Sequence, residues 1–247
     1  MKKYVVTASL LAGFSMISGT AFAQTGTIGA GWSHLDADGA GETDSYDLNG
    51  SVAIPTGGSF AVLLDGDYST NDDSNTDSLS GTAHLISRDA NGAFGGFVGM
   101  TSIDTGIGDT SAWTVGGEYA AFMGNTTLAG SLSYSNVDDL GLDVWGLGGE
   151  YRIFASDDLR FDLGAGYLRA DAGGGSIDGL QVGAGVEYRF SGTPFSLGAN
   201  VAYVDADVIN TTTIGLSLRF DFGNGSLKAR DRSGNTFGPA SGLASFF

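Results

Sequence analysis

Apolar and polar residues alternate along most of the chain, and this period of two is typical of β-strands that have one apolar face. Phe195, Leu197, Ala199, Val201 and Tyr203 form one such run, with Ser, Gly, Asn and Ala between them. Beyond residue 23 there is neither an apolar stretch of 18 residues nor a clear helical period. The pattern predicts an all-β chain.

Twelve runs of this kind can be drawn, at 25–35, 45–54, 59–69, 78–88, 93–103, 111–122, 126–136, 142–154, 159–170, 176–190, 195–205 and 208–222. The count is open by two strands, because 93–103 has apolar residues on both faces. Short connections such as 124–125 alternate with longer acidic ones such as 36–44 and 70–77. An even number of alternating strands of about 10 residues, with short turns at one rim and longer loops at the other, predicts a transmembrane antiparallel up-and-down β-barrel.

Aromatic residues on the apolar face fall at two levels along the predicted strands. Trp32, Tyr46, Tyr68, Trp113, Tyr134, Trp145, Tyr167 and Tyr203 lie near the longer loops, and Phe60, Tyr119, Tyr151, Phe161, Tyr188, Phe190, Phe195, Phe220 and Phe222 lie near the short turns. Membrane barrels place such rings at both headgroup levels, so the sequence predicts two aromatic girdles.

The first 23 residues have the features of a secretory signal peptide. Lys2 and Lys3 give a cationic start, 5–17 is apolar, and Ala21 and Ala23 provide a cleavage site before Gln24. The sequence therefore divides into a signal peptide at 1–23, a barrel at 24–222 and a C-terminal tail at 223–247.

Composition narrows the classes of function. The formal net charge of -17 argues against nucleic acid as a partner, and the absence of cysteine excludes disulfides and thiolate metal sites. We expect neither a cofactor nor a metal. An enzyme is not expected either, because the two histidines, His34 and His84, have no recognisable nucleophile motif with them.

The chain contains a weak internal repeat: the sequence Trp-Thr-Val-Gly-Gly-Glu-Tyr-Ala-Ala-Phe at 113–122 is similar to Trp-Gly-Leu-Gly-Gly-Glu-Tyr-Arg-Ile-Phe at 145–154. The shorter segment 186–190 is similar to part of both. A repeating hairpin suits an up-and-down barrel. In this pattern, from about 25 to 222, the chain resembles the porin-like superfamily of Gram-negative outer-membrane β-barrels. The resemblance implies a place in the cell outer membrane, contact with its lipid and lipopolysaccharide, and insertion by the barrel-assembly machinery. That machinery often reads a terminal aromatic residue, here Phe222 or Phe247.

Charged residues on the face opposite the apolar one are expected to line the lumen. The predicted pore-lining residues are Asp65, Asp67, Arg88, Glu118, Glu150, Arg152, Arg160, Asp162, Glu187, Arg189, Arg219 and Asp221. A symmetric hairpin around Ser156 would place Glu150 opposite Asp162, with diagonal pairs from Glu150 to Arg160 and from Arg152 to Asp162. These charges would form either a constriction that filters solutes or a network of salt bridges that only satisfies a polar lumen.

Two functions remain open. The first is a porin-like channel for passive diffusion of small hydrophilic solutes or ions, and the second is a closed barrel with a structural or surface-interaction role through acidic extracellular loops. An autotransporter translocator is disfavoured, because little chain lies between Gln24 and the first strand. The tail carries Lys228, Arg230 and Arg232, and we expect it in the periplasm; folding into the acidic barrel mouth is the alternative.

Overall fold

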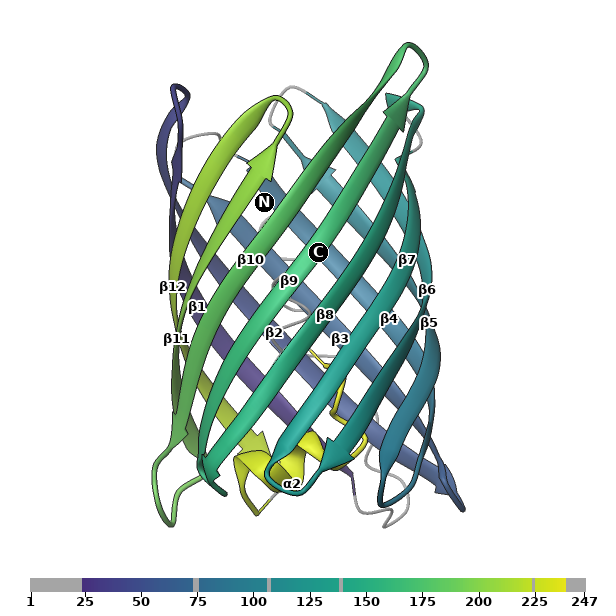
Figure 1. Ribbon diagram of the computed structural model, residues 1–247, viewed down its shortest axis with the longest axis vertical. Coiled ribbons are helices and arrows are strands. Elements are labelled where there is room, and N and C mark those ends of the chain that lie inside the picture. The colour runs from purple at the N-terminus through teal and green to yellow at the C-terminus, as the bar shows by residue number, and fades with distance from the viewer. Residues whose placement is uncertain (1–23, 73–75, 106–107, 138–139, 224, 239–247) are drawn as a thin grey trace, which may run out of the picture.

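The computed structural model describes residues 24–72, 76–105, 108–137, 140–223 and 225–238, so the predicted signal peptide lies outside the described part. The described chain forms one closed antiparallel barrel (Figure 1). Its strands are β1 (Thr25–Ala37), β2 (Gly41–Gly57), β3 (Phe60–Asn71), β4 (Thr76–Arg88), β5 (Gly92–Asp104), β6 (Asp109–Met123), β7 (Thr126–Val137), β8 (Leu142–Ser156), β9 (Leu159–Ala172), β10 (Gly175–Arg189), β11 (Phe195–Ala206) and β12 (Ile209–Phe222).

Each strand pairs with its neighbours in the sequence, and β1 pairs with β12 to close the ring. The predicted fold class and the twelve strands are thereby confirmed. The number of strands was uncertain because the segment that forms β5 has apolar residues on both faces. In the structure, these two faces have different surroundings. Phe94, Val98 and Met100 are exposed on the outside, while Phe97 faces inward and packs against His84 at 5.4 Å between ring centroids.

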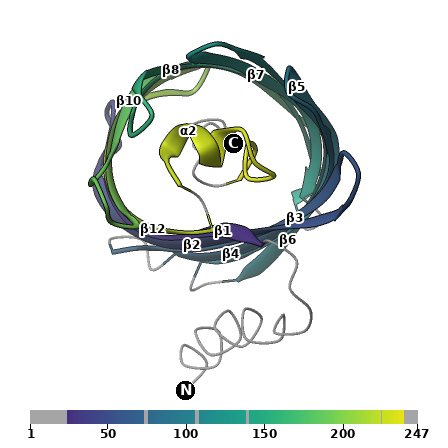
Figure 2. The ribbon, with the colours of Figure 1, turned by 90° about the horizontal axis from the view of Figure 1, so that it is seen from below.

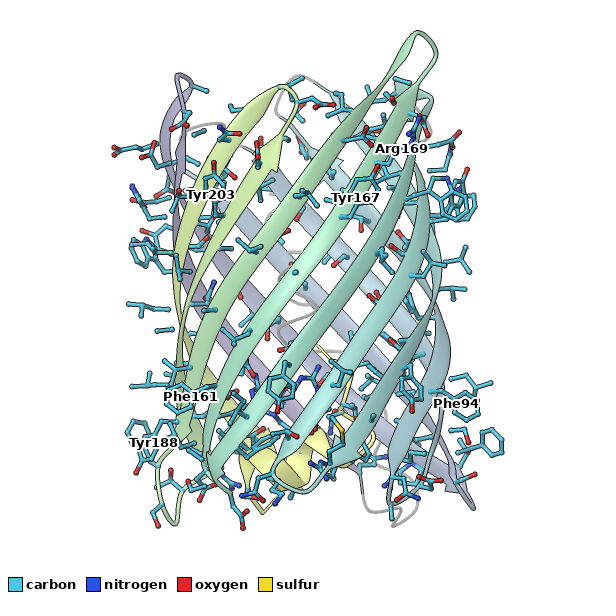
Figure 3. All side chains as sticks on the ribbon, viewed as in Figure 1. Phe94, Phe161, Tyr167, Arg169, Tyr188 and Tyr203 are labelled. Carbon is cyan, nitrogen blue, oxygen red and sulfur yellow. The ribbon has the colours of Figure 1, made fainter. Side chains whose placement is uncertain are left out.

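Large apolar side chains cover the outer surface, as alternation along a barrel strand requires. Leu132 and Leu147, for example, are each more than half exposed. Aromatic side chains mark two levels of this surface, with Phe94, Phe161 and Tyr188 near one end and Tyr167 and Tyr203 near the other (Figure 3). A belt of this composition fits the hydrocarbon layer of a membrane, with its rings at the headgroup levels.

The expected contrast between short turns and long loops is wrong in this structure. Strands β1 and β2 continue until only 38–40 connect them, although 36–44 was expected to be a loop. In that hairpin, Asp44 Oδ1 lies 2.9 Å from His34 Nδ1. The alternation of apolar and polar residues does not reveal these longer strand ends, because both faces of a strand meet water beyond the apolar belt.

The chain after β12 turns back into the barrel. A single helical turn, α2 (Leu227–Asp231), and the residues up to Gly238 lie inside the ring of strands at one end (Figures 1 and 2). We call residues 225–238 the tail segment, this end of the barrel the tail end, and the opposite end the distal end. The expectation of a tail outside the barrel is therefore corrected for the described residues, and the alternative of a tail folded into the barrel mouth is the one observed.

Gly116 allows Phe97 to point inward. A Cβ added at Gly116 would lie 2.3 Å from Phe97 Cζ and 2.6 Å from the Leu132 carbonyl oxygen, whereas a Cβ at the outward-facing Gly117 would come no nearer than 3.8 Å to the Gly95 oxygen. We expect Gly116→Ala to destabilise the barrel by about 1–3 kcal/mol through overpacking. Gly117→Ala is the matched control and should change little. Thermal unfolding in detergent, followed by circular dichroism, measures both; equal melting temperatures would contradict this account.

Candidate functional site

The tail segment is organised by its own short-range hydrogen bonds. The Ser226 side chain accepts a hydrogen bond from the Ala229 backbone N–H at 3.1 Å and caps the helical turn. After α2, the Thr236 hydroxyl donates to the Asp231 carbonyl oxygen at 2.6 Å, so that the following residues fold back on the helix. The turn directs Arg230 and Asp231 toward the barrel wall and leaves both of them buried.

Arg230 anchors the tail segment to β10 and β12. Its Nη1 donates to Glu187 Oε1 at 3.0 Å and to Asp221 Oδ1 at 3.1 Å, and its Nη2 also donates to Glu187. Glu187 is 2% exposed and Asp221 is 3% exposed, so water screens these contacts little. Burial disfavours the charged guanidinium, but Glu187 and Asp221 together raise the pKa of Arg230 above its ordinary value.

Asp231 makes the complementary contact with β7 and β8. Thr127 Oγ1 donates to Asp231 Oδ2 at 2.6 Å, and the Arg152 guanidinium donates to the other carboxylate oxygen. Burial alone would raise the pKa of Asp231, but Arg152 and the Thr127 hydroxyl outweigh that effect and lower it. Arg152 also donates to the Thr236 carbonyl oxygen at 2.9 Å, so it holds two points of the tail segment.

The inner wall at the tail end has two chemically different halves. Its apolar half comes from β2 to β7 and consists of Ala53, Leu63, Ile86, Ala93, Ala120, Phe122 and Ala129, which form one buried cluster with Phe237 of the tail segment. Its charged half comes from β8 to β12 and contains Glu150, Arg152, Arg160, Asp162, Glu187, Arg189, Arg219 and Asp221. Phe237 therefore packs against the apolar half and Arg230 binds the charged half, so each tail side chain contacts a wall surface of matching polarity.

Basic residues at the rim complete the docking. Lys228 Nζ donates to the Asn125 side-chain oxygen at 2.7 Å, at the turn between β6 and β7. Arg232 donates to the Thr126 carbonyl oxygen at 2.9 Å, and its guanidinium lies 4.6 Å from the centre of the Phe122 ring. All three basic residues that the sequence placed in the tail thus contact the barrel or its turns.

The expected register between β8 and β9 is wrong. Arg152, instead of Glu150, lies opposite Asp162, because the hairpin turns at 157–158 instead of at Ser156 and an irregularity between Phe154 and Ser156 then sets the pairing of the inward-facing residues. Arg152 pairs with Glu150 on its own strand at 2.7 Å, and Arg160 pairs with Asp162 at 2.9 Å. The shift leaves Arg152 beside the tail segment.

A second charged cluster lies deeper in the wall. His84 Nε2 is 2.8 Å from Asp65 Oδ2, and His84 Nδ1 is 2.9 Å from Glu118 Oε1. All three side chains are buried, and each ring nitrogen faces a carboxylate instead of a hydroxyl nucleophile. The pairing of His84 with Asp65 places the histidine in the network of the lumen wall.

Ten of the twelve predicted pore-lining residues thus fall into two groups. Eight of them, Arg88, Glu150, Arg152, Arg160, Asp162, Glu187, Arg219 and Asp221, belong to or adjoin the network that receives the tail segment, and Arg88 donates to the Arg232 carbonyl oxygen at 3.4 Å. Asp65 and Glu118 flank His84 instead. Arg189 donates to the Thr193 carbonyl oxygen at 3.0 Å, and Asp67 lies half-buried two residues beyond Asp65.

Sequence reasoning missed the parts played by Arg230, Asp231 and Phe237. Two signals pointed to them: the basic residues concentrated in the tail, and the apolar residues that share the inward parity of β2 to β7 near their tail-end limits. Apolar side chains that face an aqueous lumen would be unfavourable, so they require an apolar occupant.

The lumen beyond the tail segment has a different character. The inward-facing positions there are small, such as Gly164, Gly166 and Gly183, and each is half-exposed. Asn200 faces inward and is nevertheless exposed. Solvent therefore reaches the inner face at these positions of β9 to β11, whereas Gly146 and Gly148, which face inward from β8, are buried.

The described residues contain no group of three or more His, Cys, Asp or Glu side chains placed to hold a metal ion. Within the same part of the chain, no helix has the length and apolar character needed to cross a membrane.

Comparison with known proteins gives the fold. No protein-family model and no curated protein sequence matches the chain. Among solved structures, the translocator domain of the autotransporter NalP from Neisseria meningitidis aligns with a TM-score of 0.59 and 15% identity, over 90% of this chain and 96% of that one. An outer-membrane channel from Pseudomonas putida F1 aligns with a TM-score of 0.58 and 12% identity, over 81% and 95%. The KdgM porin in complex with disordered oligogalacturonate aligns with a TM-score of 0.57 and 8% identity, over 79% and 99%.

These similarities show the fold of outer-membrane β-barrels. They also support a location in that membrane, in agreement with the apolar belt and the aromatic levels of the outer surface.

Removal of the Arg230 charge should undock the tail segment. Arg230→Met deprives buried Asp221 of its guanidinium partner and removes one of the three that approach Glu187, which costs on the order of 3 kcal/mol, or roughly a hundredfold in the docking equilibrium. Arg169→Met is the matched control, because the ion pair of Arg169 with Asp171 is exposed at the distal end. Tryptic cleavage at Lys228 and Arg232, followed by mass spectrometry, should accelerate only in Arg230→Met. Equal protection in both variants would show that Arg230 does not hold the tail.

Docking should weaken in acid through Asp231. Its pKa is lowered in the docked state, so the carboxylate stabilises docking above its ordinary pKa of 3.8, and this contribution is lost as the pH falls through the lowered value. The groups facing it are Arg152, Arg160, Thr127 and Arg232. Pepsin cleavage near Leu227 and Phe237 should be faster in Asp231→Asn than in the native chain at about pH 4. This ratio should fall toward one as the pH is lowered further, whereas a constant ratio would contradict the assignment.

Proposed function

We propose that the protein is an outer-membrane channel for passive diffusion of small hydrophilic solutes or ions. The observation that carries the proposal is the inner face of β9 to β11 between the tail segment and the distal end, where small residues and Asn200 are accessible to solvent. A purely structural barrel has no need of a wet lumen lined by glycine. Porin and channel structures among the similar folds support the same class.

The acidic lining favours cations. Asp47 and Asp67 lie half-buried on the inner face of β2 and β3, and the hairpins at the distal end carry further carboxylates, including Asp36, Glu42 and Asp44. A carboxylate-rich path raises the local concentration of cations and opposes anions. The charged half of the wall is internally paired, so it contributes less to this selectivity than its number of charges suggests.

A closed barrel is the second candidate, and the docked tail segment is the observation that favours it. In that case the tail fills the tail end permanently, and the protein acts through its outer surface and acidic distal hairpins. We propose no enzymatic activity for either candidate, because the His84 cluster offers a paired histidine without a nucleophile in the described residues.

Conductance across a planar bilayer tests the channel proposal. We expect cation-selective current, and we expect Gly166→Trp to reduce it several-fold by obstructing the lumen, since a Cβ at inward-facing Gly166 meets only the Leu147 oxygen at 3.6 Å and is tolerated. Gly149→Trp is the control, because Gly149 faces outward from the adjacent strand and its Cβ would lie 3.9 Å from the Ala129 oxygen. Stable folded barrels without any current would favour the closed barrel.

A further inference from the structure

We propose that the inner wall at the tail end is a reversible docking site for the chain's own tail segment, and that release of this segment opens the lumen. The occupant is residues 225–238, and the site is the pair of wall halves defined above. The effect on passage rests on the proposed channel function, whereas the reversible docking itself does not.

The connection between barrel and tail segment is suited to a hinge. Gly223 has a φ of +77°, and a Cβ added there would lie 2.4 Å from the Gln24 carbonyl oxygen, so this glycine forms a fixed turn after β12 and the hinge lies beyond it. A Cβ added at Gly225 would meet no heavy atom within 4 Å, so this glycine is not confined by packing. Rotation at Gly225 therefore moves α2 without disturbing the pairing of β12 with β1.

Two wall residues that bind the tail segment, Glu187 and Arg152, keep other charged partners when it leaves. Glu187 retains Arg160 at 3.4 Å and Arg219 at 3.7 Å, and Arg152 retains Glu150 at 2.7 Å. Undocking therefore does not leave these two residues as isolated charges in a buried site, which would otherwise hold the tail in place. A permanent plug requires no such duplicate partners.

The composition of the tail segment suits both the docked and the released state. Arg230, Asp231 and Asn235 are polar and become solvated on release, whereas docking gives their side chains hydrogen-bond and ion-pair partners on the barrel. Phe237 and Leu227 are its buried large apolar side chains in the described residues. Polar interfaces with few apolar anchors are characteristic of separable contacts within a chain.

A disulfide lock distinguishes a releasable segment from a fixed one. A Cβ added at Gly238 would lie 3.4 Å from Ser51 Cβ, close to the range that a disulfide requires. The chain has no cysteine, so Ser51→Cys with Gly238→Cys introduces the only pair. Ser69→Cys with Ser78→Cys is the control, because these hydroxyls lie 2.9 Å apart across β3 and β4, away from the tail segment.

We expect reduction of the disulfide in S51C/G238C to raise conductance at least several-fold, while reduction of the disulfide in the S69C/S78C control leaves it unchanged. Equal conductance of oxidised and reduced S51C/G238C would overturn the effect on passage. Thiol labelling of the single variant Gly238→Cys in the folded protein tests release without any current, and complete protection against labelling would overturn reversible docking. If the Gly238→Cys thiol is labelled but no variant conducts current, the result would favour release of the tail segment and count against the channel proposal.

The native chain provides a test if the double variant fails to fold. Tryptic cleavage at Lys228 and Arg232 of intact, unsubstituted protein should proceed to completion while the barrel stays folded, at a rate set by release of the tail segment. Cleavage that occurs only when the barrel itself unfolds would show that the segment is a fixed part of the wall.

Discussion

The pairing of β1 with β12 is the constraint from which the rest of the structure follows. An open sheet edge in hydrocarbon leaves backbone N–H and C=O groups without partners, so a membrane sheet has to close. Closure of twelve strands encloses an interior that is wider than the side chains of an eight-stranded barrel fill and narrower than the channel of a large porin. The interior must therefore hold water, long charged side chains or another piece of chain. This barrel uses all three at different heights.

Charge burial at the tail end is tolerated because the guanidinium groups in the centre of the network have carboxylates beside them. Glu187 illustrates the arrangement, since Arg160, Arg219 and Arg230 all approach it. Desolvation of these groups is costly, and well-packed apolar residues would stabilise the same space at least as well. Stability alone therefore does not explain the charged half of the wall. Its retention fits a surface that must be compatible with water in one state and with a polar partner in another.

Period-two alternation was sufficient to predict the fold, because on a barrel the same parity decides which residues face lipid along every strand. Leu132 and Leu147 are outside, and Glu118 and Glu150 are inside, as that rule requires. It could not predict the register at Arg152, because the pairing depends on the exact position of the turn at 157–158 and on an irregularity near Ser156, and the alternation of residues along β8 and β9 reveals neither. The docking of Arg230 depends on wall residues 9 and 43 positions away along the sequence, and such pairs leave no local signature.

The internal repeat acquires a physical meaning from the position of the tail segment. Glu118, Glu150 and Glu187 occur in equivalent Glu-Tyr pairs on β6, β8 and β10, and all three are buried inside the barrel. Their partners differ: His84 for the first, Arg152 for the second and Arg230 for the third. A repeated hairpin thus supplies similar carboxylates at successive positions around the wall, and the tail engages the one on β10, which is nearest along the ring to β12, where the tail starts. The short connection from Phe222 allows Arg230 to reach Glu187. The tail segment then crosses the lumen, so that Phe237 reaches the apolar half of the wall. The docking site therefore suits a segment that is attached to β12.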